Sequence, residues 1–190
     1  AQSTVTANAT VGGPYTVTAS AVNGSPTPPS VDFSLSNTPA GNPVCVAFTF
    51  PYTLAGTDNT ARVAELRQAI ECANGNATDD DIDLDGHTLV FDNAVDGSNA
   101  LSAITSDITL RNGELERQSA APAFRFLEVA ATGQLTVRDM QLRRGFATGE
   151  GGAILALGGL MLFNSTLENN EATTDGGAVS THSQAMMVMT

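Results

Sequence analysis

The amino-acid sequence predicts an all-β fold, a right-handed parallel β-helix in which successive turns of chain stack as a solenoid. The main observation is an internal repeat, because residues 135–154 and 160–179 are copies of one unit. Equivalent residues, such as Leu135 and Leu160, are always 25 positions apart. A constant offset without gaps indicates a structural repeat, and a unit this small buries its apolar face only by stacking on its neighbours.

Two further observations support stacked strands. Apolar residues alternate with others over short runs, which is the pattern of strands with one buried face. Glycine pairs at 151–152 and 176–177 interrupt these runs and predict corners, because glycine accepts backbone angles that other residues avoid. An antiparallel sandwich with accidental self-similarity is the alternative, but it has no reason to keep a gapless period. The expected interior of the stack is Leu135, Val137, Leu142, Ile154, Leu160, Leu162, Leu167 and Val179.

One helix is predicted, at residues 59–74, ahead of coils that begin near residue 80 and run to residue 190. Asp58 or Asn59 is expected to cap its N-terminus, and Asn74 with Gly75 ends it. Apolar residues fall on one face of this helix. The first coil of a stack has an open apolar end, so we expect the helix to cover it as an N-terminal cap.

Residues 1–39 are predicted as a separate β segment, and residues 40–190 as the capped β-helix. Alternating residues indicate strands at 3–7, 15–21 and 31–36, separated by glycine and proline turns. The segment resembles the closing strands of bacterial Ig-like repeat domains. Three strands are too few for a sandwich, which needs about seven. The prediction is therefore an incomplete Ig-like sandwich segment with open strand edges.

The composition is strongly acidic, with a formal net charge of −12, eight basic residues that are all arginine, and no lysine. Such a surface argues against nucleic acid or an anionic membrane as a partner. No stretch reaches the ~18 apolar residues of a membrane span, so no membrane insertion is expected. Composition alone leaves both a mature secreted chain and a cytoplasmic chain open.

The two cysteines, Cys45 and Cys72, are far apart and have no nearby histidine, so they do not form a metal motif. We expect a disulfide that ties a predicted strand at 44–50 to the helix. Two buried free thiols are the alternative.

A family resemblance emerges from the cap onwards. It covers residues 44–181 and is carried by Leu66-Arg-Gln-Ala-Ile70, Ala73-Asn74, Asp81-Ile-Asp-Leu84, Gly86-His-Thr-Leu89 and the coil at 164–179. These resemble the C-S-L-R-E-A-I signature and the coils of bacterial surface right-handed parallel β-helix proteins, and the coils of polymorphic outer-membrane proteins. Ala64 departs from the signature, where the family has cysteine. The resemblance implies an extracellular or cell-surface protein and no catalytic activity.

The best candidate for a site is an acidic run, in which Asp81, Asp83 and Asp85 alternate before a glycine and Asp92 follows. This spacing imitates a calcium loop, in which clustered carboxylates bind a hard cation. Ile82 and Leu84 alternate with the aspartates, however, so the run also fits a strand with an acidic outer face. Calcium is the one cofactor that the sequence suggests.

No catalytic residue is predicted. Glu150, Glu168 and Asp175 lie near turns and are candidates for the paired carboxylates of a glycosidase, although solvated acids at turns are the commoner case. His87 and His182 have no recognisable nucleophile beside them.

We therefore expect a non-catalytic structural or adhesive protein that binds a carbohydrate or a ligand on a host or cell surface. The alternative is a carbohydrate-active β-helix enzyme of the polysaccharide lyase or glycoside hydrolase type. The first strand of a third coil is expected at residues 184–190, 25 positions after Leu160, so either the protein continues beyond it or this end docks onto another copy. Open edges there and in residues 1–39 predict head-to-tail self-association, which makes filaments when it does not close.

Overall fold

The computed structural model describes residues 12–19, 31–37, 45, 48–76, 78–182 and 187–189, and for 12–19, 31–37 and 187–189 it describes the backbone path. The chain divides into two compact units, residues 1–42 and 43–190. The sequence predicts this boundary between residues 39 and 40. In the first unit, β1 (Gly12–Ala19) and β2 (Val31–Asn37) pair antiparallel. The predicted strand at 3–7 lies outside the described residues.

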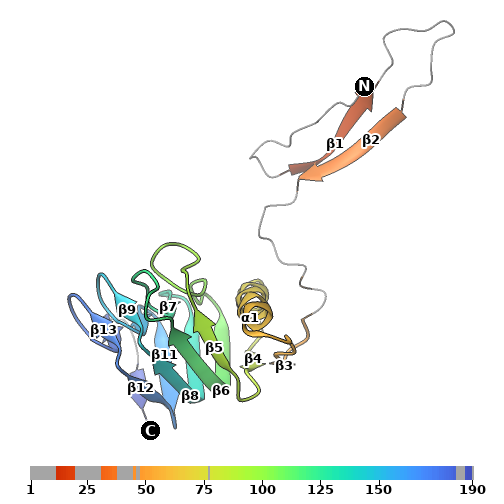
Figure 1. Cartoon of the computed structure of the whole chain (residues 1–190). Coiled ribbons are helices and arrows are strands. Elements are labelled where there is room, and N and C mark those ends of the chain that lie inside the picture. The colour runs from red at the N-terminus through yellow and green to blue at the C-terminus, as the bar shows by residue number, and fades with distance from the viewer. Residues whose placement is uncertain are drawn as a thin grey trace, which may run out of the picture. The chain divides into compact units, whose positions relative to one another are not determined.

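In its described residues the second unit is mostly β with one helix, and the paired strands run parallel (Figure 1). Its largest sheet has the order β15-β11-β8-β6-β4-β3, with β5 also paired to β6 and β12 to β8. A second sheet has the order β14-β10-β7, and a third pairs β13 with β9. The bounds are β3 Tyr52–Thr53, β4 Asp80–Asp83, β5 Thr88–Phe91, β6 Asp107–Arg117, β7 Leu127–Val129, β8 Gln134–Arg143, β9 Phe146–Ala147, β10 Ile154–Ala156, β11 Gly159–Phe163, β12 Thr166–Glu168, β13 Glu171–Ala172, β14 Val179–Thr181 and β15 Met187–Met189.

The chain visits the same sheets again after each turn. Leu135 lies opposite Leu160 and Ile154 opposite Val179, so the 25-residue repeat is the length of one turn. Other turns are longer: Leu110 pairs with Val137, 27 positions on, and so does Leu160 with Met187. The last strand therefore begins two positions later than the repeat predicts.

The apolar interior runs along the whole stack. Six of the eight residues predicted to be inside are buried, and Leu167 and Val179 are partly buried against the same core. The core continues under the second sheet, where Leu127 and Val129 of β7 and Ile154 and Ala156 of β10 are buried. Stacked parallel strands bury both their inner faces and their backbone ladders, which is why strands as short as two or three residues suffice in several turns.

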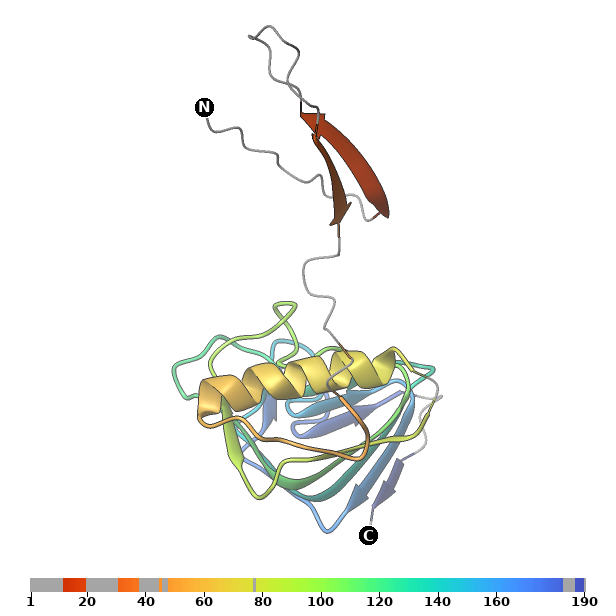
Figure 2. The ribbon, with the colours of Figure 1, turned by 90° about the vertical axis from the view of Figure 1, so that its right-hand side faces the viewer.

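Helix α1 (Asn59–Asn74) lies across one end of the stack, where Figure 2 shows the turns one behind another. The predicted helix and its Asp58 cap are confirmed, since the Asp58 side chain accepts a hydrogen bond from the Ala61 N–H. Asn59 binds both the N–H and the C=O of Val90, at 2.7 and 2.8 Å. The Asn74 side chain accepts a hydrogen bond from the N–H of Thr105 and donates one to the C=O of Ala103. The helix thus satisfies backbone groups that an uncovered edge would leave unpaired.

Residues 48–50, predicted as part of a strand at 44–50, are not in a strand, and Cys45 lies in a 3₁₀ turn. Pro51 follows, and proline has no N–H to contribute to a strand ladder. The apolar residues are used instead for packing: Phe48 and Phe50 contact the ring of Tyr52 and lie against the core. The pairing of this region with the stack begins only at β3.

Candidate functional site: a polar groove across four turns

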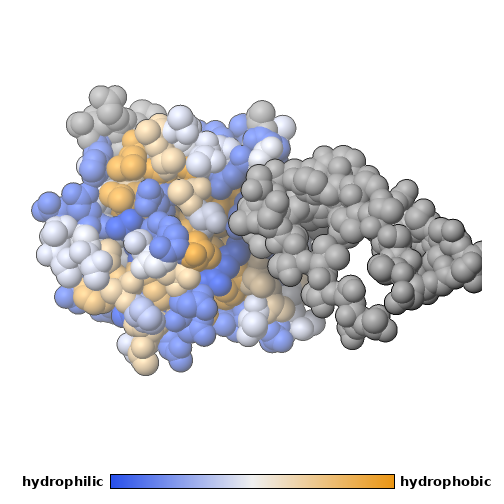
Figure 3. All heavy atoms as spheres, turned by 90° about the horizontal axis from the view of Figure 1, so that it is seen from above, coloured by the Kyte–Doolittle hydropathy of each residue, from blue (hydrophilic) through white to orange (hydrophobic). Residues whose placement is uncertain are grey.

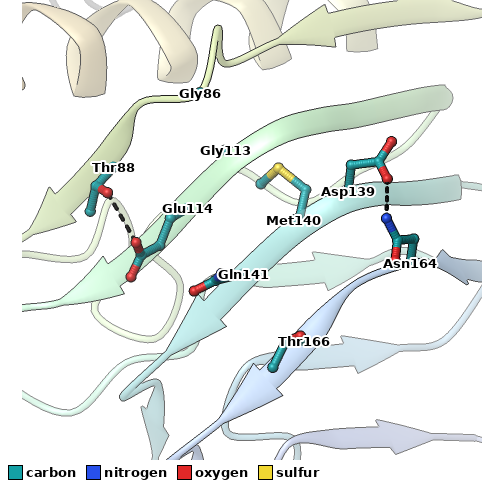
Figure 4. A pocket seen from close by; sticks show the side chains of 9 residues that line it. All are labelled: Gly86, Thr88, Gly113, Glu114, Asp139, Met140, Gln141, Asn164 and Thr166. Carbon is teal, nitrogen blue, oxygen red and sulfur yellow. Dashed lines mark hydrogen bonds between the residues drawn. The ribbon is translucent and has the colours of Figure 1, made fainter.

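An open groove of about 460 Å³ crosses four successive turns of the largest sheet (Figure 4). The buried Met140 and the half-buried Gly113 lie at its base. Polar side chains from β5, β6, β8 and β12 line it. The lining residues are Gly86, Thr88, Gly113, Glu114, Asp139, Met140, Gln141, Asn164 and Thr166.

One border of the groove is a column of residues with left-handed backbone. Asp85, Asn112, Asp139 and Asn164 have φ of 53°, 58°, 52° and 46°. Each stands at the same bend of its turn, 27, 27 and 25 positions after the one before. Asparagine and aspartate are the residues, apart from glycine, that adopt this conformation most readily. The Asn164 side-chain amide donates to Asp139 Oδ1 at 2.5 Å, so a hydrogen bond also joins the last two members of the column.

The other border is a column of outward-facing polar side chains. Thr88 pairs with Glu114, Glu114 with Gln141, and Gln141 with Thr166 in the strand register. The Thr88 hydroxyl donates to Glu114 Oε2 at 3.0 Å. Among the described residues, neither the Gln141 carboxamide nor the Thr166 hydroxyl makes a hydrogen bond. These two side chains are exposed and free to bind a ligand.

A column of charged side chains lies two positions further along the same strands, beside the groove. Arg143 stands between Glu116 and Glu168 in register. Its guanidinium contacts Glu114, and it lies 2.8 Å from Glu116 and 4.0 Å from Glu168. Opposite charges on directly facing strand positions stabilise a sheet, whereas like charges destabilise it. Arg143 therefore neutralises the glutamates beside the groove.

The four aspartates predicted to bind calcium are not brought together. Asp81 and Asp83 project from β4 onto Arg111, at 2.7 and 2.5 Å, and the hydrogen bond to Asp81 raises the pKa of that guanidinium. Asp85 lies in the bend described above, and Asp92 follows β5. Nowhere among the described side chains do three His, Cys, Asp or Glu residues form a candidate metal site. The alternation with Ile82 and Leu84, both buried, gives a strand with an acidic outer face.

Cys45 and Cys72 form a disulfide, which joins the segment before β3 to the last turn of α1. Glu150 and Glu168, two of the three carboxylates considered for a glycosidase, each face a basic group. Glu150 contacts His182 at 2.7 Å, and this hydrogen bond lowers the pKa of the Glu150 carboxyl. Glu168 faces Arg143.

The sequence reasoning missed the groove. The regular spacing of Asp85, Asn112, Asp139 and Asn164 along the sequence could have indicated the border of the groove. The 25-residue repeat, however, includes only Asp139 and Asn164. Their role becomes visible once the strand register is known.

Comparison with known proteins gives one family match, to the Chlamydia polymorphic membrane protein repeat at residues 164–182. This match confirms the predicted resemblance of the coil at 164–179 and points to a bacterial outer-membrane or cell-surface protein. Neither the capping signature nor the Ig-like resemblance is matched. No curated protein and no solved structure matches significantly. Across the described residues, no helix has the length and apolar character needed to cross a membrane.

Proposed function

We propose that residues 43–190 form a right-handed parallel β-helix that serves as a non-catalytic structural or adhesive scaffold on the outside of a bacterial cell. The observation that carries this proposal is the reuse of equivalent positions by successive turns. Leu110, Val137 and Leu162 occupy one column of the core on three neighbouring strands. Right-handedness is the expected sense, since crossovers between parallel strands of one sheet are almost always right-handed.

Exposure outside the cell is supported by three features. The coil at 164–182 matches the polymorphic membrane protein repeat. A disulfide persists in an oxidising compartment and is rare in the cytosol. The excess of acidic residues keeps a long, strand-rich molecule soluble and separate from its neighbours.

A structural role is also supported by the way the charged residues are used. Glu114, Glu116 and Arg143 neutralise one another across neighbouring turns, and Asp81 and Asp83 neutralise Arg111. Such columns hold neighbouring turns together. Head-to-tail self-association and a role for calcium stay predictions.

The scaffold proposal is tested by deleting one whole turn. Deletion of residues 134–158 joins Gly133 to Gly159 and brings β11 beside β6, in the place of β8. Glu168 would then face Glu116, so the variant also carries Glu168→Arg, which restores the charge that Arg143 supplied. We expect a cooperative thermal transition and an unchanged far-ultraviolet circular dichroism spectrum per residue.

The matched control deletes residues 134–146, about half a turn, with the same Glu168→Arg substitution. This deletion puts every later residue out of register, so we expect loss of the cooperative transition. Equal behaviour of the two deletions would refute the stacked architecture. Protease treatment of intact producing cells tests the location: the protein should be degraded while a cytoplasmic marker is retained.

A further inference from the structure

The groove between the two polar columns offers hydrogen-bonding groups that the fold itself does not use. Gln141 presents one carbonyl oxygen and an NH₂ group, and Thr166 a hydroxyl, all without a partner among the described residues. Asp139 has acceptor capacity beyond the bond from Asn164 that Figure 4 shows, whereas the two oxygens of Glu114 are engaged by Thr88 and Arg143. The groove wall thus offers both donors and acceptors to a ligand.

The shape of the groove indicates an extended ligand. Its lining comes from four turns, and adjacent strands of a sheet are about 4.8 Å apart. Polar side chains recur at that interval along the stack. A chain whose own polar groups repeat along its length can bind at several of these levels at once, which raises its affinity through multiple contacts.

The chemistry of the lining indicates a polyhydroxylated ligand without charge. The Asp139 carboxylate, on a protein with a net charge of −12, repels anionic polymers. Arg143 is already engaged by glutamates. A bound peptide strand needs an unpaired sheet edge, but β6 and β8 are paired on both sides. Met140 alone offers an apolar contact at the base.

We propose that this groove binds a neutral polysaccharide, which lies across the strands along the stack. The proposal rests on the adhesive role proposed above and names its ligand class and its site. Gln141 and Thr166 would bind sugar hydroxyl groups directly, and Asp139 would accept from them. Figure 3 shows the molecule from above, where apolar patches are separated by hydrophilic residues.

The test blocks the groove without disturbing the core. Gly86 lines the groove at φ +72°, and a Cβ there would meet nothing within 4 Å. Asparagine tolerates this backbone conformation, so Gly86→Asn should fold and place its side chain in the groove. Gly97 is the matched control, since it lies outside the groove at φ +85° and also has open space around it. Gly97→Asn should leave binding unchanged.

Binding of neutral hexasaccharides of glucose, mannose, galactose and xylose to the whole chain would be measured by isothermal titration calorimetry. Hexagalacturonate and hexa-arginine serve as anionic and cationic probes. We expect at least one neutral hexasaccharide to bind, with Gly86→Asn abolishing the signal. The double variant Gln141→Ala, Thr166→Ala should weaken binding about tenfold, from the loss of two hydrogen bonds. Its control is Gln118→Ala, Thr174→Ala, at exposed positions outside the groove.

The inference is overturned if no neutral oligosaccharide binds, if only a charged probe binds, or if Gly86→Asn and the double variant both bind like their controls. Release of shorter sugars during the titration would instead overturn the non-catalytic part of the proposed function. The turn-deletion experiment reports on the scaffold independently of any ligand, so failure of one proposal is distinguishable from failure of the other.

Discussion

Val137 of β8 lies directly opposite Leu162 of β11, its equivalent 25 positions later in the chain. Val137 is fully buried and Leu162 is 6% exposed. On the other side Val137 pairs with Leu110, so its side chain is packed between two neighbouring turns. A residue in this position stabilises its own turn and both adjacent ones.

Truncation of this side chain should therefore be costly. We expect Val137→Ala to lower the free energy of unfolding by about 2 kcal/mol, from lost burial and the cavity that remains. Val95 supplies the matched control, because it is 43% exposed and undergoes the same chemical change. Val95→Ala should stay within about 0.5 kcal/mol of the parent. Urea unfolding of both variants measures the difference, and equal effects would contradict the core assigned here.

The corner at Gly151 should tolerate no side chain. Its φ is +61°, and a Cβ would lie 2.2 Å from the carbonyl oxygen of Ile154. Gly86 also has positive φ but open space, so it isolates the cost of the backbone conformation. We expect Gly86→Ala to cost about 1 kcal/mol and Gly151→Ala more than about 3 kcal/mol. Thermal unfolding of the two variants gives the comparison, and similar melting temperatures would show that this corner can relax.

Much of the second unit was predictable, because the sequence patterns that specify it lie within short segments or recur in successive turns. The gapless offset between Leu135 and Leu160 gave the register of β8 and β11, which the strand pairing confirms. Helix α1 was predictable from its cap residue and its apolar face, both of which lie within one short segment. A repeat also implies which residues share the core, and six of the eight predicted are buried.

The features that could not be predicted depend on contacts between residues far apart in the sequence. The acidic run at 80–85 gave no local sign of Arg111, whose place opposite Asp83 is set by a turn of 28 residues. A search for the 25-residue period also misses the column of Asp85, Asn112 and Asp139, because these residues are 27 positions apart. The alternation at 44–50 indicated a strand, but packing of Phe48 and Phe50 around Tyr52 took precedence over local propensity.

The disulfide should contribute strongly to the attachment of α1. It closes a loop between positions 27 apart, for which the lost chain entropy of the unfolded state predicts a stabilisation of about 3.5 kcal/mol. We expect reduction to lower the midpoint of urea unfolding by a corresponding amount. The variant Cys45→Ser, Cys72→Ser should match the reduced parent and should not respond to reductant. A parent midpoint that reduction leaves unchanged would show that the helix is held by its other contacts alone.

Tyr52 should make stability depend on alkaline pH. Its hydroxyl donates to Glu65, which also accepts from the N–H groups of Ala55 and Gly56. Burial, followed by the hydrogen bond and the charge of Glu65, raises the pKa of Tyr52 from 10.0 to about 12. The folded state therefore holds the phenol proton more tightly than the unfolded state does. The resulting stability is fully present below pH 10 and is lost as the pH rises to about 12.

The measurement uses a Tyr15→Phe background, in which Tyr52 is the only tyrosine left of two. Ultraviolet titration of the folded protein should show phenolate formation near pH 12, and Glu65→Gln should move it towards 10. The free energy of unfolding should fall with pH between these values in the Tyr52 protein. It should fall less in Tyr52→Phe, which also loses about 1 kcal/mol at neutral pH with the hydrogen bond. Phenolate formation near pH 10 in the folded parent would contradict the Tyr52–Glu65 contact, because an unpaired, solvated phenol titrates there.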